Sequence, residues 1–293
     1  MANATVGPVE LHYEEFGDGN DPPLLMVMGL GAQMIVWPDE LCQGLVDRGF
    51  RVIRFDNRDV GMSTWFDGVE VDMAAAVTAG MMGQPFDGAP YNLSDMAADA
   101  IGLLDHLDIS QANIVGASMG GMIVQTMAIE HGDRIASLCS IMSNTGNPEF
   151  GAPTPDAMGA LLSPGPTERE AAIEHSVGVS KVISSAAHFD EDDVRARAAA
   201  HYDRGFNPDG VTRQVAAIMA SGSREEGLQA LDLPTLVIHG AQDPLITPTG
   251  GERTAELVPD AELLMLEEMA HDLPIPLWGP IISSITSNVI RVA

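Results

Sequence analysis

Residues 113–122 read Asn-Ile-Val-Gly-Ala-Ser-Met-Gly-Gly-Met, so an apolar run ends in Gly-x-Ser-x-Gly and leads at once into a helical pattern. This pattern is typical of a nucleophile elbow, a sharp strand-to-helix turn that holds a serine hydroxyl clear of the sheet in a strained backbone conformation. Small residues at positions 116 and 120 let the neighbouring backbones approach closely. Ser118 is therefore the first candidate nucleophile. Because five letters recur by chance, the surrounding sequence has to support the interpretation.

Two further strand-like runs carry the partners that a serine nucleophile needs. The apolar run 234–239 leads into a loop with Asp243, and the run 261–266 leads into a loop with His271. Ligands of parallel sheets lie outside the carboxyl ends of the strands, so the three side chains are expected to converge on one edge. An imidazole can take the hydroxyl proton of Ser118, and a carboxylate can orient that imidazole.

Each candidate also has a plainer interpretation. Ser118 could be only a small residue at a tight turn, and His271 a solvated loop histidine. Asp243 precedes Pro244 and could be a turn former whose side chain binds its own backbone. Asp272 stands next to His271 and is the alternative acid. The order serine, acid, histidine along the chain favours the catalytic interpretation with Asp243.

The fourth element of the predicted site lies near the start of the chain. The apolar run 24–28 is followed by a Gly-rich loop, residues 29–33, before a helical pattern begins near residue 36. A loop in this place can offer one backbone N–H to an oxyanion, and the residue after the nucleophile offers the other. We therefore predict an oxyanion hole formed by the amides of Leu30 and Met119. The alternative is that Gly29 and Gly31 only make a strand-to-helix turn.

Strand-like and helix-like runs alternate along most of the chain, which predicts an α/β fold with a mostly parallel central sheet flanked by helices. Strands are expected at 9–16, 24–28, 51–56, 112–117, 135–142, 234–239 and 261–266, and helices at 36–48, 93–108 and 119–131. The alternation breaks between residues 147 and 230, where a Gly/Pro-rich opening precedes helical segments near 167–185, 190–203 and 209–220. An insertion of this length predicts a helical cap over the site, with a core of 1–146 and 231–293.

Two further motifs give the chain a family resemblance. Residues 55–63 read Phe-Asp-Asn-Arg-Asp-Val-Gly-Met-Ser, and residues 237–243 read Val-Ile-His-Gly-Ala-Gln-Asp. Together with the elbow, they resemble the loop after the fourth strand and the acid-bearing loop of the α/β-hydrolase superfamily. The resemblance spans nearly the whole chain and implies the α/β-hydrolase fold.

Two departures from the superfamily pattern narrow the resemblance. The usual His-Gly of the oxyanion loop is replaced by Met28-Gly29, and Asp59 stands where glycine is usual. With residues 37–40, Trp-Pro-Asp-Glu, these features resemble the aclacinomycin methylesterase-like branch. The members that give this branch its name hydrolyse the methyl ester of a polyketide, so the resemblance implies an esterase.

Composition agrees with an intracellular enzyme. The chain has 293 residues, of which 45% are apolar, enough to bury a large core as one domain with an insertion. Its apolar runs are too short to cross a bilayer, and its first residues lack the pattern of a secretion signal, so we expect a cytoplasmic protein. Cys42 and Cys139 do not suggest a disulfide framework. The sequence has neither metal-ligand spacing nor a phosphate-binding loop, and we expect no metal and no cofactor.

Charge is the most unusual bulk property. The 42 acidic residues outnumber the 14 basic ones, for a net charge of −28, and Lys181 is the only lysine. Such a surface repels nucleic acid and anionic membranes, so neither is an expected partner. Compositional drift with a need for solubility explains the excess, and adaptation to high salt is the alternative.

These observations predict a serine carboxylic ester hydrolase that acts on small to medium apolar esters, methyl esters among them, through an acyl-enzyme. A lactonase, a thioesterase or a carbon–carbon bond hydrolase would use the same triad, and a ligand-binding receptor or scaffold is the non-enzymatic alternative. Methionine suits an adaptable apolar pocket. Pocket residues are expected at Met81, Met82, Met158 and Leu162, although packing between cap and core would also explain them. The natural substrate and the oligomeric state stay open.

Overall fold

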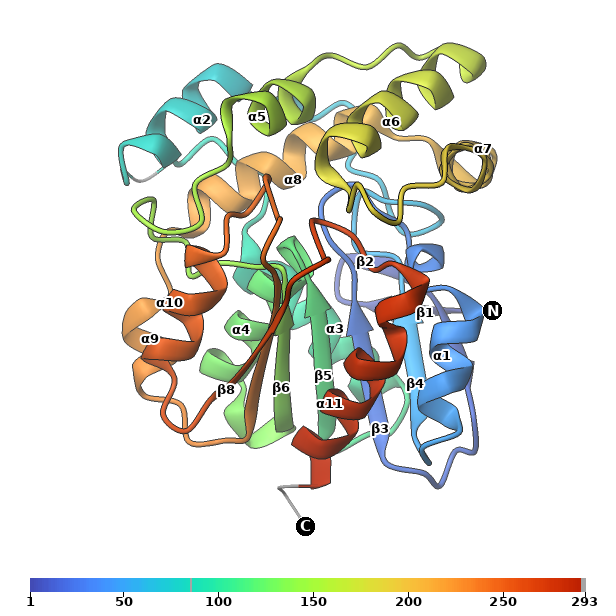
Figure 1. Cartoon of the computed structure of the whole chain (residues 1–293), viewed down its shortest axis with the longest axis vertical. Coiled ribbons are helices and arrows are strands. Elements are labelled where there is room, and N and C mark those ends of the chain that lie inside the picture. The colour runs from blue at the N-terminus through green and yellow to red at the C-terminus, as the bar shows by residue number, and fades with distance from the viewer. Residues whose placement is uncertain (85, 291–293) are drawn as a thin grey trace.

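The computed structural model of the chain describes residues 1–84 and 86–290, within which eight strands form one sheet (Figure 1). The order is β1-β2-β4-β3-β5-β6-β7-β8. The strands are β1 (Ala2–Val6), β2 (Val9–Phe16), β3 (Pro23–Val27), β4 (Arg51–Phe55), β5 (Ala112–Ala117), β6 (Ile135–Ile141), β7 (Thr235–Gly240) and β8 (Glu262–Leu266). Strands β1 and β2 pair antiparallel with their neighbours, whereas β4 and β3 through to β8 pair in parallel. The predicted mostly parallel sheet is confirmed.

Helices cover both faces of the sheet because its inner strands are apolar on both sides. Along β3, Leu25 and Val27 belong to one core cluster and Leu24 and Met26 to the other, as the two-residue period of a strand requires. One face is covered by α3 (Leu93–His106), α4 (Met119–Glu130), α9 (Glu225–Gln229) and α10 (Thr249–Leu257), and the other by α1 (Asp39–Val46) and α11 (Trp278–Ile290). Short 3-10 turns lie at Met34–Val36, Gly132–Arg134 and Ile275–Leu277.

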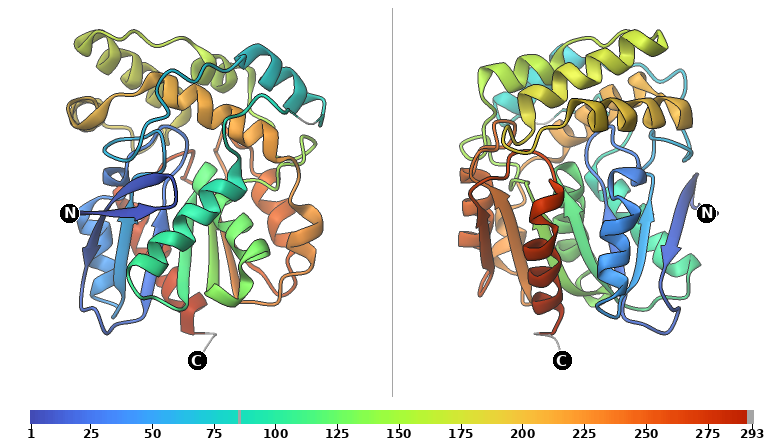
Figure 2. Two further views of the ribbon diagram at one scale, coloured as in Figure 1. Left: turned by 180° about the vertical axis from the view of Figure 1, so that it is seen from behind. Right: turned by 45° about the vertical axis from the view of Figure 1, so that its right-hand side comes forward.

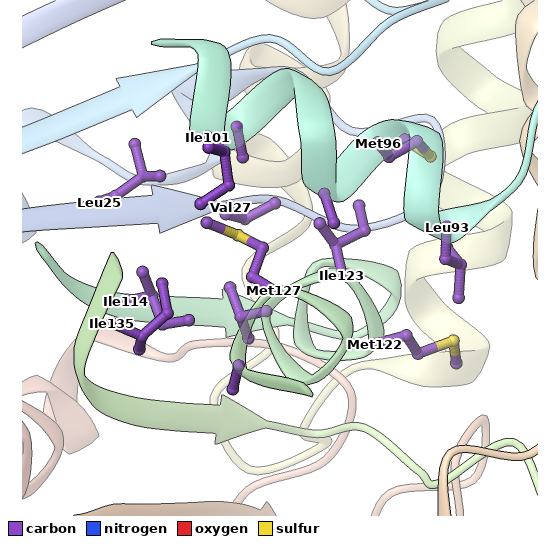
Figure 3. Close-up of a cluster of buried hydrophobic side chains, with 14 of the residues drawn as sticks. Leu25, Val27, Leu93, Met96, Ile101, Ile114, Met122, Ile123, Met127 and Ile135 are labelled. Atoms are coloured by element: carbon purple, nitrogen blue, oxygen red, sulfur yellow. The ribbon is translucent and has the colours of Figure 1, made fainter. Parts of the chain in front are cut away.

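The core on the α3–α4 side lies directly beneath the elbow. Figure 3 shows Val27 of β3 and Ile114 of β5 facing Ile123 and Met127 of α4, with Ile101 of α3 above them. Each of these side chains is at most 8% exposed. Burying one such side chain is worth about 1.5–3 kcal/mol, so this cluster holds the first turns of α4 firmly against the sheet. A rigid support of this kind is what a strained turn before α4 needs.

Helices α5 (Pro155–Leu162), α6 (Arg169–Ile183), α7 (Glu191–Gly205) and α8 (Pro208–Ser221) form a layer over the carboxyl ends of the strands, and we call them the cap (Figures 1 and 2). Polar side chains bind the free backbone amides at the start of two of these helices. At α5 the Thr154 hydroxyl accepts from the Ala157 amide, and at α8 the Asn207 side chain accepts from the Gly210 amide. The predicted cap insertion is thus present. Its boundaries at residues 147 and 230 stay predictions.

Several elements escaped the sequence analysis. The polar edge strand β1 was not expected, nor were α5, α9, α10 and α11. Helix α2 (Met73–Met81) was not expected either, and it packs against α8 of the cap. Helix α5 begins at Pro155, because proline is favourable at the first position of a helix even though it breaks one elsewhere. In the described residues, no helix is long and apolar enough to span a membrane.

Candidate active site

Ser118 occupies the turn between β5 and α4 with φ 57° and ψ −121°. Residues other than glycine rarely adopt this backbone conformation, which costs on the order of 1–3 kcal/mol. Two glycines make the turn possible: a Cβ on Gly116 would lie 2.1 Å from the carbonyl oxygen of Gly120, and a Cβ on Gly120 2.1 Å from that of Val27. The Gly-x-Ser-x-Gly spacing is therefore a steric requirement of this turn.

Two hydrogen bonds from β6 and the residues after it keep the turn in place. The Ser118 amide donates to the carbonyl of Ile141 over 2.9 Å, and the Ser143 hydroxyl donates to the carbonyl of Ser118 over 2.9 Å. Both backbone groups of the strained residue are thus satisfied, which leaves its side-chain hydroxyl to make other contacts.

The structure brings Ser118, His271 and Asp243 together from three strand ends. His271 Nε2 lies 3.0 Å from Ser118 Oγ, and His271 Nδ1 lies 2.8 Å from Asp243 Oδ2. Asp243 is 2% exposed, whereas Ser118 and His271 are partly exposed. The arrangement has the geometry of a hydroxyl, a proton-accepting imidazole and an orienting carboxylate.

The Asp243 carboxylate is fixed by its own loop. Its Oδ1 accepts the amides of Leu245 and Ile246, each over 2.9 Å, and its Oδ2 faces His271. Behind it, His239 Nε2 lies 3.7 Å from Oδ2 and 2.8 Å from the carbonyl of Ile246. Burial lowers the pKa of His239, so this second imidazole is neutral and donates to the carbonyl. Each oxygen of Asp243 therefore has a set task, with Oδ2 left for His271.

Asp272, the alternative acid, binds Ser185 and not the His271 ring. Its Oδ1 accepts the amide of Ser185, over 3.1 Å, and the hydroxyl of the same residue. The Ser185 oxygen in turn accepts the amide of Ala270 over 2.8 Å, and the His271 amide donates to the carbonyl of Ile183 over 3.0 Å. The end of α6 thus docks on the histidine loop, and the Asp272 carboxylate binds the cap rather than the His271 ring.

The predicted oxyanion loop, residues 29–33, packs against the elbow. A Cβ on Gly29 would lie 2.9 Å from Ser118 Cβ, so only glycine fits beside the serine. The Gly31 amide donates to Gln214 Oε1 over 2.8 Å, and the Ala32 amide donates to the Gly29 carbonyl over 3.2 Å. Because both amides are engaged, the Leu30 amide is the better candidate in this loop for binding an oxyanion.

Asp59, the departure from the superfamily pattern, has a structural role that the sequence analysis missed. It is fully buried with φ 67°, a left-handed conformation that aspartate tolerates in place of glycine. Its carboxylate accepts two hydrogen bonds from Arg213 of α8, at 2.9 and 2.7 Å, and one from the Tyr91 hydroxyl at 2.6 Å. Burial and the Asp59 charge raise the pKa of Tyr91, so its hydroxyl remains a donor. Asp59 therefore anchors the cap.

The four predicted pocket residues are not gathered in one lining. Met82 is 66% exposed and Leu162 39% exposed, Met158 is half-buried on α5, and the side chain of Met81 lies outside the described part of the structure. A hollow of about 680 Å³ lies between α5, the end of α6 and the loop after Asp243. It is lined by Thr154, Pro155, Asp156, Gly159, Ala160, Val182 and Pro244. A pocket role for the four residues stays a prediction.

In the described residues, no group of three or more His, Cys, Asp or Glu side chains is placed to hold a metal ion. The two cysteines are buried and free, and burial raises the pKa of the Cys42 thiol to about 12. A thiol with so high a pKa is a poor nucleophile at neutral pH.

Residues 22–276 match the family model described as alpha/beta hydrolase fold, so the chain belongs to this family, as its motifs predicted. Curated relatives include rhodomycin D methylesterase of Streptomyces peucetius, 28% identical over 303 residues that cover 96% of this chain and 95% of the relative. The 3-oxoadipate enol-lactonase 2 of Acinetobacter baylyi is 27% identical, with 90% and 87% covered. A methylesterase among the relatives agrees with the branch that the departures at residues 28 and 59 indicated.

Solved structures share the whole fold. The enol-lactonase from Burkholderia xenovorans superposes with a TM-score of 0.76 at 24% identity, and the match covers 99% of this chain and 100% of the other. At this identity the likeness shows the fold alone.

Proposed function

We propose that the protein is a serine carboxylic ester hydrolase. The observation that carries the proposal is the placement of Ser118 Oγ, on a strained elbow, 3.0 Å from His271 Nε2, while the other ring nitrogen of that histidine lies 2.8 Å from the buried Asp243. A receptor or scaffold would have no need to hold a serine in a costly conformation against a correctly oriented imidazole.

The reaction follows from this geometry. Ser118 Oγ attacks the ester carbonyl carbon as its proton passes to His271 Nε2, and Asp243 stabilises the imidazolium. The carbonyl oxygen becomes an oxyanion that the amides of Leu30 and Met119 bind. Collapse breaks the bond to the alcohol, which leaves with the proton from His271. Water then attacks the acyl-enzyme, with His271 again the base, and releases the acid. No cofactor takes part in this sequence.

The charges around the site favour a neutral substrate. Three arginines near the boundary between cap and core are each neutralised by a carboxylate, in the pairs Arg58–Asp99 at 2.6 Å, Arg204–Asp56 at 2.6 Å and Arg213–Asp59 at 2.7 Å. A fourth, the buried Arg224, already donates to neutral acceptors, the Gln125 side chain and the carbonyls of Gly222 and Asn144. Burying an unpaired substrate carboxylate beside such pairs is costly, and the net charge of −28 opposes its approach. The methylesterase among the relatives points to a small leaving alcohol. We therefore propose methyl and other small-alcohol esters of apolar or cyclic acids as the substrate class.

We further propose that residues 147–230 act as the lid of a core formed by 1–146 and 231–293. Helices α5 to α8 cover the strand ends at which Ser118 and His271 lie, so the acyl group has to enter beneath or beside them (Figure 1). An enclosed apolar site raises the strength of the electrostatic contacts to the reacting groups.

A fluorophosphonate probe and a substrate panel test the function. Wild-type protein should be labelled at Ser118, and the Ser118→Ala variant should not. The panel compares kcat/KM for methyl esters, p-nitrophenyl esters, a lactone, a thioester and a ring-fission diketone. Preference for the lactone would make the protein a lactonase, the activity named for one relative, and preference for the diketone by tenfold would make it a carbon–carbon hydrolase. Failure to label would favour a scaffold.

A further inference from the structure

The oxyanion loop, residues 29–33, is bound by the cap as well as by the core. Its Gly31 amide donates to Gln214 of α8, and its Gln33 amide lies 3.3 Å from His201 Nε2 of α7. The Gln33 side-chain amide also donates to the carbonyls of His201 and Gly205, at 2.8 and 2.9 Å. These contacts join segments about 170 to 180 residues apart in the sequence, so cap packing bears on the loop beside Ser118.

Gln214 is the most constrained of these partners. Its side chain is fully buried, and both ends of its amide are used: Oε1 accepts from the Gly31 amide, and Nε2 donates to the carbonyl of Arg58 over 2.8 Å. Arg58 is itself held by two hydrogen bonds to Asp99, at 2.6 and 2.7 Å. The amide therefore connects the oxyanion loop to a buried, hydrogen-bonded part of the core.

The same helix also limits the loop sterically. Gly31 has φ +64°, and a Cβ built on it would lie 2.9 Å from a methyl group of Val211, one turn before Gln214 on α8. The Leu30 and Gly31 amides belong to successive planar peptide groups that are separated only by the φ and ψ of Leu30, so holding the Gly31 amide limits the directions open to the Leu30 amide. An oxyanion donor has to lie within about 2.7–3.1 Å of the developing charge, and small rotations of this loop would move it out of that range.

We propose that Gln214 is a positioning residue for the oxyanion hole, which fixes the Leu30 amide by holding the amide next to it. The inference rests on the proposed serine hydrolase function. Gln214 does not touch the reacting atoms. It acts on the transition state because the oxyanion, and not the intact ester, needs the loop in this geometry.

Two substitutions test the proposal. Gln214→Met keeps the size of the side chain and removes both hydrogen bonds. Gln214→Glu, in its neutral form, has a carbonyl oxygen and an O–H group in the places of the amide oxygen and the NH₂ group, so it can remake both bonds. Burial raises the pKa of such a carboxyl, and the neutral form is therefore favoured near pH 6.

The matched control is Ser221→Ala on the same helix. The Ser221 hydroxyl oxygen accepts the amide of Leu93 over 2.9 Å, so its loss removes a contact between cap and core away from the oxyanion loop. It should lower the unfolding temperature and leave kcat unchanged.

The measurements are kcat and KM for a methyl ester, the unfolding temperature, and the Kd of an alkyl trifluoromethyl ketone. The ketone probes the hole directly: Ser118 Oγ adds to its carbonyl carbon, the proton moves to His271, and the carbonyl oxygen becomes a bound oxyanion. In Gln214→Met we expect kcat to fall about 10- to 100-fold and the ketone affinity to fall in parallel, with KM within about threefold. Gln214→Glu should recover most of the ketone affinity at pH 6. Part of that affinity should be lost as the pH rises, because the ionised carboxylate still accepts from the Gly31 amide but can no longer donate to the Arg58 carbonyl.

An unchanged kcat and ketone affinity in Gln214→Met, with only a lower unfolding temperature, would reduce Gln214 to a structural contact and overturn the proposal. An equal weakening in Gln214→Glu at pH 6 would do the same, because the hydrogen bonds would then not be the cause. A wild type that binds the ketone in a Gln214-dependent way without cleaving any ester would refute the proposed function and leave the inference standing.

Discussion

Asp243→Asn should lower kcat by about four orders of magnitude while the fold is kept. The reason lies in the two amides of Leu245 and Ile246, which both donate to Oδ1. In the variant, the carbonyl oxygen of the asparagine has to stay with these donors, so the NH₂ group takes the place of Oδ2 and faces His271 Nδ1. A donor in that position makes Nδ1 the acceptor and puts the ring proton on Nε2. His271 then cannot take the proton of Ser118.

The magnitude follows from the loss of the base. A triad with the histidine in the wrong tautomer loses about 10⁴ in kcat, which corresponds to about 5.5 kcal/mol at 1.36 kcal/mol per decade. Because asparagine keeps the two backbone hydrogen bonds and nearly the volume of aspartate, the unfolding temperature should change little.

Asp272→Asn is the matched control, since it neutralises the neighbouring carboxylate on the same loop. Its Oδ1 can still accept the amide and hydroxyl of Ser185, so we expect a loss in kcat below about fivefold. The assay is steady-state hydrolysis of a p-nitrophenyl ester at pH 8, with thermal unfolding of each variant. A kcat for Asp243→Asn within tenfold of wild type, or a larger loss in Asp272→Asn, would refute this reasoning.

Further predictions concern the nucleophile, pH and salt. Ser118→Ala and His271→Ala should each lose nearly all turnover, and the double variant should be scarcely worse, because the two groups act as a unit. If the Ser118→Ala variant retained a tenth of the wild-type activity, Ser118 would be excluded as the nucleophile. Burial, with the Arg204 cation nearby, lowers the pKa of His201 to about 4. The unfolded chain binds that proton first, so the free energy of unfolding should fall as the pH drops from 6.5 to 4, by at most about 3 kcal/mol, and His201→Gln should flatten this slope in acid unfolding curves. The net charge of −28 predicts that the unfolding temperature rises between low salt and about 0.5 M sodium chloride, and a flat response would remove high-salt adaptation.

The sequence by itself determined the fold family and the candidate triad because the signals for both are local. In a Gly-x-Ser-x-Gly run after an apolar strand, the two glycines permit the close approach that this turn needs, as the distances at Gly116 and Gly120 show. Asp243 and His271 follow their own strands, and parallel pairing of β5, β6, β7 and β8 carries all three loops to one edge. Hydrophobic patterns of two- and 3.6-residue period likewise located most core elements to within a few residues.

Tertiary structure alone decided which contacts complete the site. Asp243 and Asp272 are the same residue type, and each is close enough in the sequence to be a candidate acid. Their roles differ because Asp272 binds Ser185, whereas Asp243 faces His271. Gln214 and His201 lie in cap helices and belong to no sequence motif, so their contacts with the oxyanion loop could not be predicted from periodicity. A side-chain hydrogen bond depends on direction within a few tenths of an ångström, which is set by how distant segments pack and not by local preference.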